Sequence, residues 1–94
     1  MYTLKFRIKN TPETERLLPA VDAWLIRCLH ENFKWLWENK IINVEEGVYD
    51  QLWDCYFIPI DIYEESNVVD HIQKCLESDL LFANYFIGIT VMAN

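Results

Sequence analysis

Glycine and serine are both scarce in this sequence of 94 residues. The two glycines, Gly47 and Gly88, stand alone, whereas a loop that binds phosphate through backbone amides needs several glycines close together. The two serines, Ser66 and Ser78, stand where helix ends are expected, and neither lies in a G-x-S-x-G motif. Neither nucleotide binding by a glycine-rich loop nor serine hydrolysis is therefore predicted.

Cysteine and histidine are also few. Cys28, Cys55 and Cys75 are odd in number and lack C-x-x-C spacing, which gives no support to a disulfide framework or a thiolate zinc site. His30 and His71 are far apart in the sequence, so we predict no metal site and no cofactor. Paired carboxylates alone do not indicate acid-base chemistry, because burial and geometry must first separate their pKa values. We predict that the protein is not an enzyme.

Long apolar segments are missing as well. The first residues alternate charged with apolar side chains, unlike the uninterrupted apolar region of a signal peptide. The longest apolar stretch, Leu80 to Ala93, contains Asn84 and is too short to span a bilayer. Free thiols fit a reducing compartment. The sequence predicts a cytoplasmic protein that does not enter a membrane.

Basic residues are outnumbered by acidic ones, eight to fifteen, which gives a net charge of −7. Binding to nucleic acid or to an anionic membrane requires Lys and Arg, so we predict neither. The imbalance belongs to the second half of the chain, where residues 41–94 hold ten acids and one base, Lys74. A basic partner is favoured.

Period-two alternation over Tyr2 to Ile8 predicts a strand with one buried face. A helix is expected to begin near Thr11 and to continue to about Asn39, with a kink or a restart at Pro19.

A second strand is expected from about residue 53 to 63, with Pro59 favouring an edge position or a local bulge. A helix over 67–78 and a long, central final strand over 81–92 complete the pattern. The predicted fold is one domain, residues 1–94, of the α/β (or α+β) class. Its expected order is β-α-(α)-β-α-β, a small three-stranded sheet with helices packed on one face.

Large rings are abundant, since 15% of the residues are aromatic. Trp24, Trp35 and Trp37 lie partly off the apolar stripe of the first predicted helix. They are candidates for an exposed aromatic contact patch, or for a second buried face if the helix is sandwiched.

Acids surround aromatic residues in the segment from Glu45 to Cys55. If residues 48–55 are helical, Asp50 and Asp54 lie on one face, four residues apart. If they form a strand, Asp50 and Asp54 again share a face, and Trp53 points to the other. An acidic row is expected in both cases, and a cationic cleft on a partner would neutralise it.

The run Gly47-Val48-Tyr49-Asp50-Gln51-Leu52-Trp53-Asp54-Cys55 resembles a helix of barstar-type ribonuclease inhibitors. Those inhibitors are small acidic α/β proteins with a parallel sheet covered by helices, and they occupy the basic active site of a ribonuclease. The resemblance covers residues 47–55 only. It implies that Asp50 and Asp54 face the cations that bind phosphate in the enzyme.

The leading hypothesis is a non-enzymatic inhibitor of the immunity or antitoxin type that blocks a basic bacterial toxin or nuclease. One alternative is a phage or mobile-element protein that mimics nucleic acid and blocks a defence complex. Another is a homodimeric accessory or structural subunit. The residues predicted to contact the partner are Glu45, Glu46, Tyr49, Asp50, Trp53, Asp54, Asp61, Glu64 and Glu65.

Overall fold

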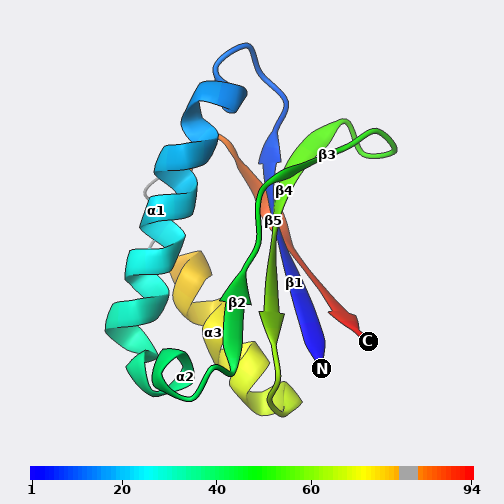
Figure 1. Ribbon diagram of the computed structural model, residues 1–94. Coiled ribbons are helices and arrows are strands. Elements are labelled where there is room, and N and C mark those ends of the chain that lie inside the picture. The colour runs from blue at the N-terminus through cyan, green and yellow to red at the C-terminus, as the bar shows by residue number, and fades with distance from the viewer. Residues whose placement is uncertain (79–82) are drawn as a thin grey trace.

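The computed structural model describes residues 1–78 and 83–94, and these residues form five strands and three helices (Figure 1). All three helices lie on one side of the sheet in this view. The elements are β1 (Tyr2–Lys9), α1 (Thr14–Asn32), α2 (Lys34–Glu38), β2 (Ile42–Val44), β3 (Val48–Asp50), β4 (Cys55–Ile62), α3 (Ser66–Ser78) and β5 (Phe86–Ala93).

The sheet is antiparallel, in the order β2-β4-β1-β5. Strand β3 pairs with the first residues of β4, whereas β2 pairs with the last residues of the same strand. The mixed α/β class is confirmed, but the sheet has five strands and not three. If β2 and β3 count as one interrupted strand, the chain follows the split βαβ order, with the first strand between the third and the last. The final strand, expected to be central, is an edge strand, and its predicted beginning at 81 and 82 lies outside the described residues.

Strand β1 shows why the sheet forms where it does. Leu4, Phe6 and Ile8 are completely buried, and they alternate with polar side chains that point to the face without helices. The alternation predicted from the sequence is confirmed, because a strand with one covered face must place every second side chain in the core. We call the other side of the sheet the open face.

Helices α1 and α3 each bury one row of apolar side chains against the sheet. Val21, Leu25 and Leu29 of α1 are completely buried, and so are Ile72 and Leu76 of α3. The apolar stripe predicted for the helix over residues 67–78 is confirmed in α3. None of the described helices has both the length and the apolar character that a membrane crossing requires.

Of the two expectations for Pro19, the restart of the helix is wrong, and the kink stays a prediction. Helix α1 runs through this residue, and the helical segment ends at Asn32, before Phe33 separates it from α2. Pro19 is exposed and lies in the second turn of α1, where its missing amide costs one hydrogen bond near the helix start.

Pro59 coincides with the interruption between β2 and β3. Its carbonyl accepts a hydrogen bond from the Glu45 amide at 2.9 Å, so its backbone faces the outer strand. Proline has no N–H to return to that strand. The pairing shifts by one residue between Val44, opposite Ile60, and Val48, opposite Phe57. The pairing opposite Pro59 is therefore interrupted in the neighbouring strand. The edge position that Pro59 also suggested is wrong, because β4 is paired on both sides.

A second irregularity lies at the start of β5. Arg7 is opposite Gly88 and Ile8 is opposite Phe86, which leaves Ile87 as an extra residue. The bulge reverses the alternation, so the Phe86 ring packs against Phe6, with centroids 5.1 Å apart, while Ile87 is 52% exposed.

Candidate functional site

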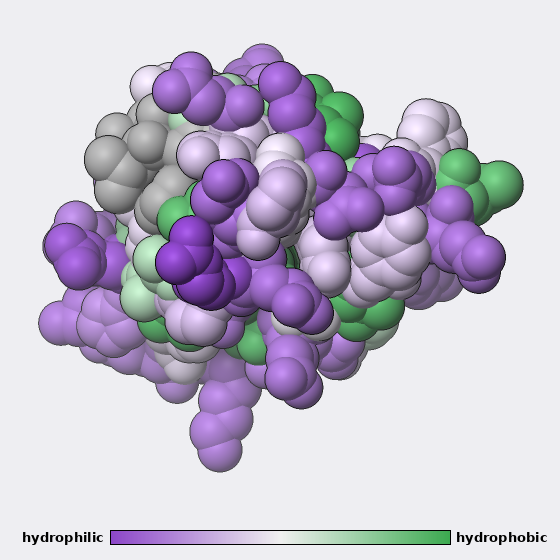
Figure 2. All heavy atoms as spheres, turned by 90° about the horizontal axis from the view of Figure 1, so that it is seen from above, coloured by the Kyte–Doolittle hydropathy of each residue, from purple (hydrophilic) through white to green (hydrophobic). Residues whose placement is uncertain are grey.

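The turn between β3 and β4 carries the most exposed large apolar side chains of the described residues. Leu52 is 89% exposed and Trp53 is 66% exposed. The turn projects from the body of the protein at the upper right of Figure 1. Seen from above in Figure 2, hydrophobic atoms stand at the outer end of this projection among hydrophilic ones. We call residues 48–57 the aromatic hairpin.

Exposed side chains continue from the turn onto the two strands that support it. Val48 and Tyr49 are each almost half exposed, and Phe57 is partly buried. Together with Leu52 they line a shallow groove of about 710 Å³. An apolar surface with a groove, rimmed by polar residues, is typical of a protein-protein contact.

Asp50 fixes the turn. One of its carboxylate oxygens accepts hydrogen bonds from the amides of Leu52 and Trp53, at 3.1 and 3.3 Å. The other oxygen accepts a charge-assisted hydrogen bond from Arg7 at 3.1 Å. The guanidinium of Arg7, foremost, holds the pKa of Asp50 below its usual value, and the turn amides add to this effect. Through these three hydrogen bonds the carboxylate ties the turn to β1.

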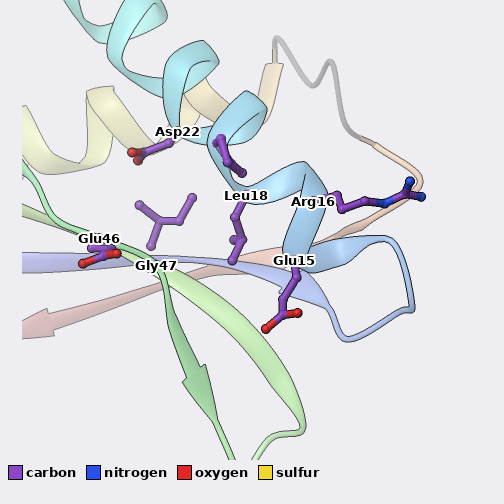
Figure 3. Close-up of a pocket in the computed structure, with 8 residues that line it drawn as sticks. Glu15, Arg16, Leu18, Asp22, Glu46 and Gly47 are labelled. Atoms are coloured by element: carbon purple, nitrogen blue, oxygen red, sulfur yellow. The ribbon is translucent and has the colours of Figure 1, made fainter.

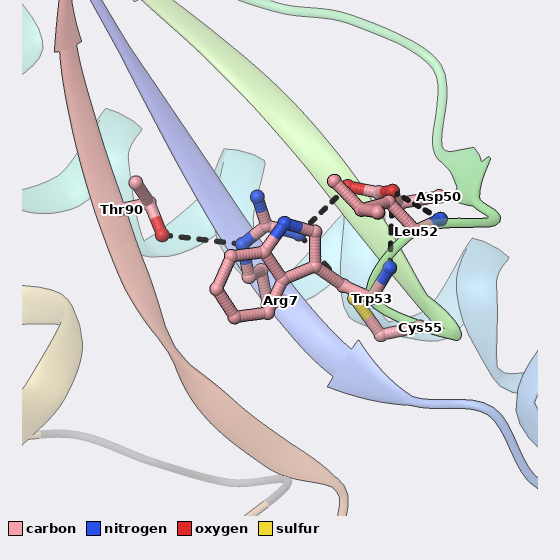
Figure 4. Close-up of polar contacts among 6 residues, drawn as sticks. All are labelled: Arg7, Asp50, Leu52, Trp53, Cys55 and Thr90. Carbon is pink, nitrogen blue, oxygen red and sulfur yellow. Dashed lines mark hydrogen bonds and ion pairs between the residues drawn. The ribbon is translucent and has the colours of Figure 1, made fainter.

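Arg7 is the centre of the arrangement (Figure 4). Its side chain is 9% exposed, and it donates to Thr90 on β5 at 3.1 Å and to the Cys55 sulfur at 3.4 Å as well as to Asp50. The Trp53 ring lies over the guanidinium, 5.2 Å from ring centroid to carbon. A cation with these partners is well satisfied despite burial, and it links the turn to two strands of the sheet.

Asp54 holds the second half of the turn. Its backbone is in the left-handed region, with φ of 47°, which an aspartate tolerates better than most residues. Its carboxylate accepts hydrogen bonds from the Tyr49 hydroxyl at 2.6 Å and from Asn10 at 3.0 Å. These bonds, the one from Tyr49 foremost, lower the pKa of Asp54, and the same bond raises the pKa of Tyr49.

The predicted acidic row does not exist as a single surface. Tyr49, Asp50, Trp53 and Asp54 do come together in the aromatic hairpin, but as a strand and a turn and not as a helix. Asp50, whose side chain is 17% exposed, faces Arg7, and the exposed Asp54 accepts hydrogen bonds from Tyr49 and Asn10. Both carboxylates hold the turn, and their expected role as charges presented to a partner stays a prediction.

Glu45 and Asp61 form a separate pair on the β2 side of the sheet. Asp61 is 9% exposed and accepts a hydrogen bond from the Thr3 hydroxyl at 2.8 Å. A hydrogen bond with Asp61 raises the pKa of the Glu45 carboxyl. Asp61, predicted as a contact residue, is thus mostly enclosed.

Glu46 turns toward the helices and away from the hairpin. It lines a pocket of about 540 Å³ between α1 and the β2–β3 connection, together with Asp22 and Glu15 (Figure 3). Burial, and then the charge of Glu46, raise the pKa of Asp22. Arg16 points away from these three acids in Figure 3. In the described part of the chain no group of three or more His, Cys, Asp or Glu residues is arranged to hold a metal.

The remaining predicted residues are dispersed. Glu64 and Glu65 follow β4, at the end of that strand opposite to the turn, and the Glu65 carbonyl accepts hydrogen bonds at the start of α3. Trp24 and Trp37 pack against the core, whereas Trp35 is 47% exposed. The three tryptophans therefore do not form one exposed patch.

Sequence reasoning missed Arg7, Asn10 and Leu52 as members of the site. The alternation over Tyr2 to Ile8 places Arg7 on the polar face of its strand, but it does not indicate which carboxylate pairs with it. Comparison with known proteins gives no match: neither a family model, nor a curated protein, nor a solved structure matches the chain.

Proposed function

We propose that the protein is a non-enzymatic inhibitor that binds a basic protein, such as a toxin or nuclease, through the aromatic hairpin. The observation that carries the proposal is the exposure of Leu52 and Trp53 on a turn that is held by its own hydrogen bonds. Exposing such side chains has a cost in water unless a partner covers them, and a turn that is already ordered loses little entropy on binding. Trp residues of this kind often supply most of the binding energy of an interface.

The charge of the partner is inferred from the whole molecule. A net charge of −7 produces a negative field that speeds encounter with a basic surface. In this proposal the negative field steers the partner, and the exposed side chains of the hairpin provide the contact. Asp50 holds the turn in place through its ion pair with Arg7. The alternative of a nucleic-acid mimic requires carboxylates spread like phosphates over one surface, and here they occupy separate places.

The resemblance to barstar-type inhibitors carries no weight in this proposal. It implied a parallel sheet and a helix at residues 47–55, whereas all the paired strands are antiparallel and these residues form β3 and a turn. The inhibitor hypothesis therefore depends on the exposed turn and the charge.

The test is recovery of a partner from the source cell with the tagged wild-type chain, followed by calorimetry with the recovered protein. The double variant Leu52→Ser/Trp53→Ala should weaken binding by more than about 100-fold, because each anchor contributes about 2 kcal/mol or more. Trp35→Ala, which removes an exposed indole from α2, is the matched control and should change affinity by less than about threefold.

Inhibition of the recovered protein should follow the same order, and the association rate should fall as salt is raised. Equal affinity of the wild type and the double variant would remove the hairpin as the contact. Recovery of a strongly acidic partner would contradict the inferred charge.

A further inference from the structure

The outer edge of β5 is the least protected part of the sheet. This strand has eight residues, and none of them is charged or proline. Within residues 1–78 and 83–94 no strand pairs with its outer side. Proteins usually protect such an edge with lysine, proline, a bulge or a covering loop. Among residues 1–78 and 83–94, the device found at this edge is the bulge at Ile87, which leaves residues 88–93 regular.

The backbone groups available at this edge follow from the hydrogen bonds on the inner side. The Asn94 amide donates to the Met1 carbonyl at 2.9 Å, so the backbone of residue 94 faces β1. The backbone groups of an antiparallel strand alternate between its two sides. Ile89, Val91 and Ala93 therefore direct their N–H and C=O groups outward.

Apolar side chains accompany these groups. Val91 lies opposite Leu4, which places it on the face covered by the helices, yet it is 38% exposed. Met92 lies opposite Thr3 on the open face and is 43% exposed. The helices thus stop short of the edge, and both faces of β5 present apolar surface beside unpaired backbone.

We propose that two copies of the chain pair antiparallel through β5, around a two-fold axis at Val91. The axis stands perpendicular to the sheet, so both sets of helices lie on the same face and the two Val91 side chains meet beside them. Pairing of two copies brings no like charges together within the strand, because β5 has none.

The opposite edge of the sheet cannot pair in this way. β2 and β3 have three residues each and are separated by the irregularity at Pro59, and the acidic residues Glu45 and Glu46 lie between them. A second copy is therefore the occupant that fits the free edge, because it supplies an uncharged strand of equal length.

The expected dimer is weak and reversible. Six residues of strand extend about 20 Å, and such a contact belongs to the small end of specific interfaces. This inference goes beyond the proposed inhibition. In the dimer the two aromatic hairpins lie at the far ends of one continuous sheet, since β5 and β3 are at opposite edges. Both hairpins remain free for a partner.

Sedimentation velocity on the full chain between about 2 and about 200 μM tests the proposal. The wild type should change from monomer to dimer over this range. Val91→Lys should remain monomeric, because a lysine at a strand edge opposes pairing. Ile26→Lys, which adds the same charge at a 40% exposed position on α1, should dimerise like the wild type.

Met92→Lys provides a second edge variant in case Val91→Lys folds poorly, and circular dichroism checks both. Amide exchange offers an independent measurement, since the amides of Ile89, Val91 and Ala93 should exchange more slowly at high concentration. A wild type that stays monomeric throughout would overturn the proposal. So would a dimer that the Leu52→Lys variant abolishes while both edge variants retain it.

Discussion

The two edges of the sheet offer partners different kinds of contact. At one edge, β3 is short and continues into a turn, and the carboxylates of Asp50 and Asp54 hold that turn through side-chain hydrogen bonds. At the other edge, β5 is uncharged and held by its backbone ladder with β1. The first edge displays exposed large apolar side chains, and the second displays unpaired peptide groups. The two proposals therefore assign unrelated interactions to opposite edges of one sheet.

The largest effect on this comparison is expected from Phe86→Ala. The Phe86 ring packs on Phe6 at the start of β5. The bulge leaves the neighbouring Ile87 52% exposed, so this residue adds little to the packing. Loss of a partly buried ring should lower the free energy of unfolding by about 2–3 kcal/mol. Urea denaturation measures the change, and Tyr63→Ala, at a 55% exposed position, is the control and should cost less than about 0.5 kcal/mol. An equal loss of unfolding free energy in the two variants would mean that the Phe86 ring does not stabilise the start of β5.

Acid should loosen the hairpin edge before it affects the β5 edge. Hydrogen bonds lower the pKa values of Asp50 and Asp54 in the folded protein below the ordinary value of 3.8. Their stabilising contribution is therefore complete above that pH and is lost as the pH falls through the lower, folded pKa values.

We expect the Trp53 fluorescence and the protection of the Leu52 amide to change below about pH 4. The β5 ladder, without ionisable side chains, should persist until the whole domain unfolds. Asp50→Asn should loosen the turn at neutral pH and remove most of its pH dependence, whereas Asp70→Asn on α3 should not. Loosening of the β5 ladder before the turn as the pH is lowered would contradict this view of the hairpin.

The smallest expected effect concerns Glu46, in the connection between β2 and β3, and its neighbour Asp22 on α1. Burial and the charge of Glu46 raise the pKa of Asp22, so the ionised form of Asp22 is disfavoured and stability falls as the pH rises through that pKa. Glu46→Gln should raise stability at neutral pH by less than about 0.5 kcal/mol, because Glu46 is exposed and screened by solvent. Thermal unfolding measures the gain, which should shrink in acid. Glu31→Gln removes a charge from α1, the helix that carries Asp22. A similar gain from this variant would indicate a general effect of net charge.

Local patterns accounted for the central strand and the helix near the end of the chain. The alternation of Leu4, Phe6 and Ile8 and the stripe that contains Ile72 and Leu76 depend on neighbours in the sequence, and both are present in the structure. The bulge at Ile87 left no such trace. Residues on both sides of it are apolar, so either alternation fits the final strand equally well.

The candidate site was only partly predictable. The aromatic and acidic residues of the hairpin were identified, but their arrangement depends on Arg7 and Asn10, which lie more than 40 positions earlier in the chain. The i, i+4 spacing of Asp50 and Asp54 was interpreted as a helix or a strand face. The left-handed backbone at Asp54 and the hydrogen bonds to Asp50 make it a turn instead.

The contacts between Arg7 and the turn have a consequence for attempts to shorten the molecule. A synthetic peptide that copied residues 48–57 would contain Leu52 and Trp53 but would lack the guanidinium beneath the indole and the amide of Asn10. It would be a flexible fragment, and ordering it would consume much of the energy gained on contact. A minimal mimic would need to graft the first strand along with the loop.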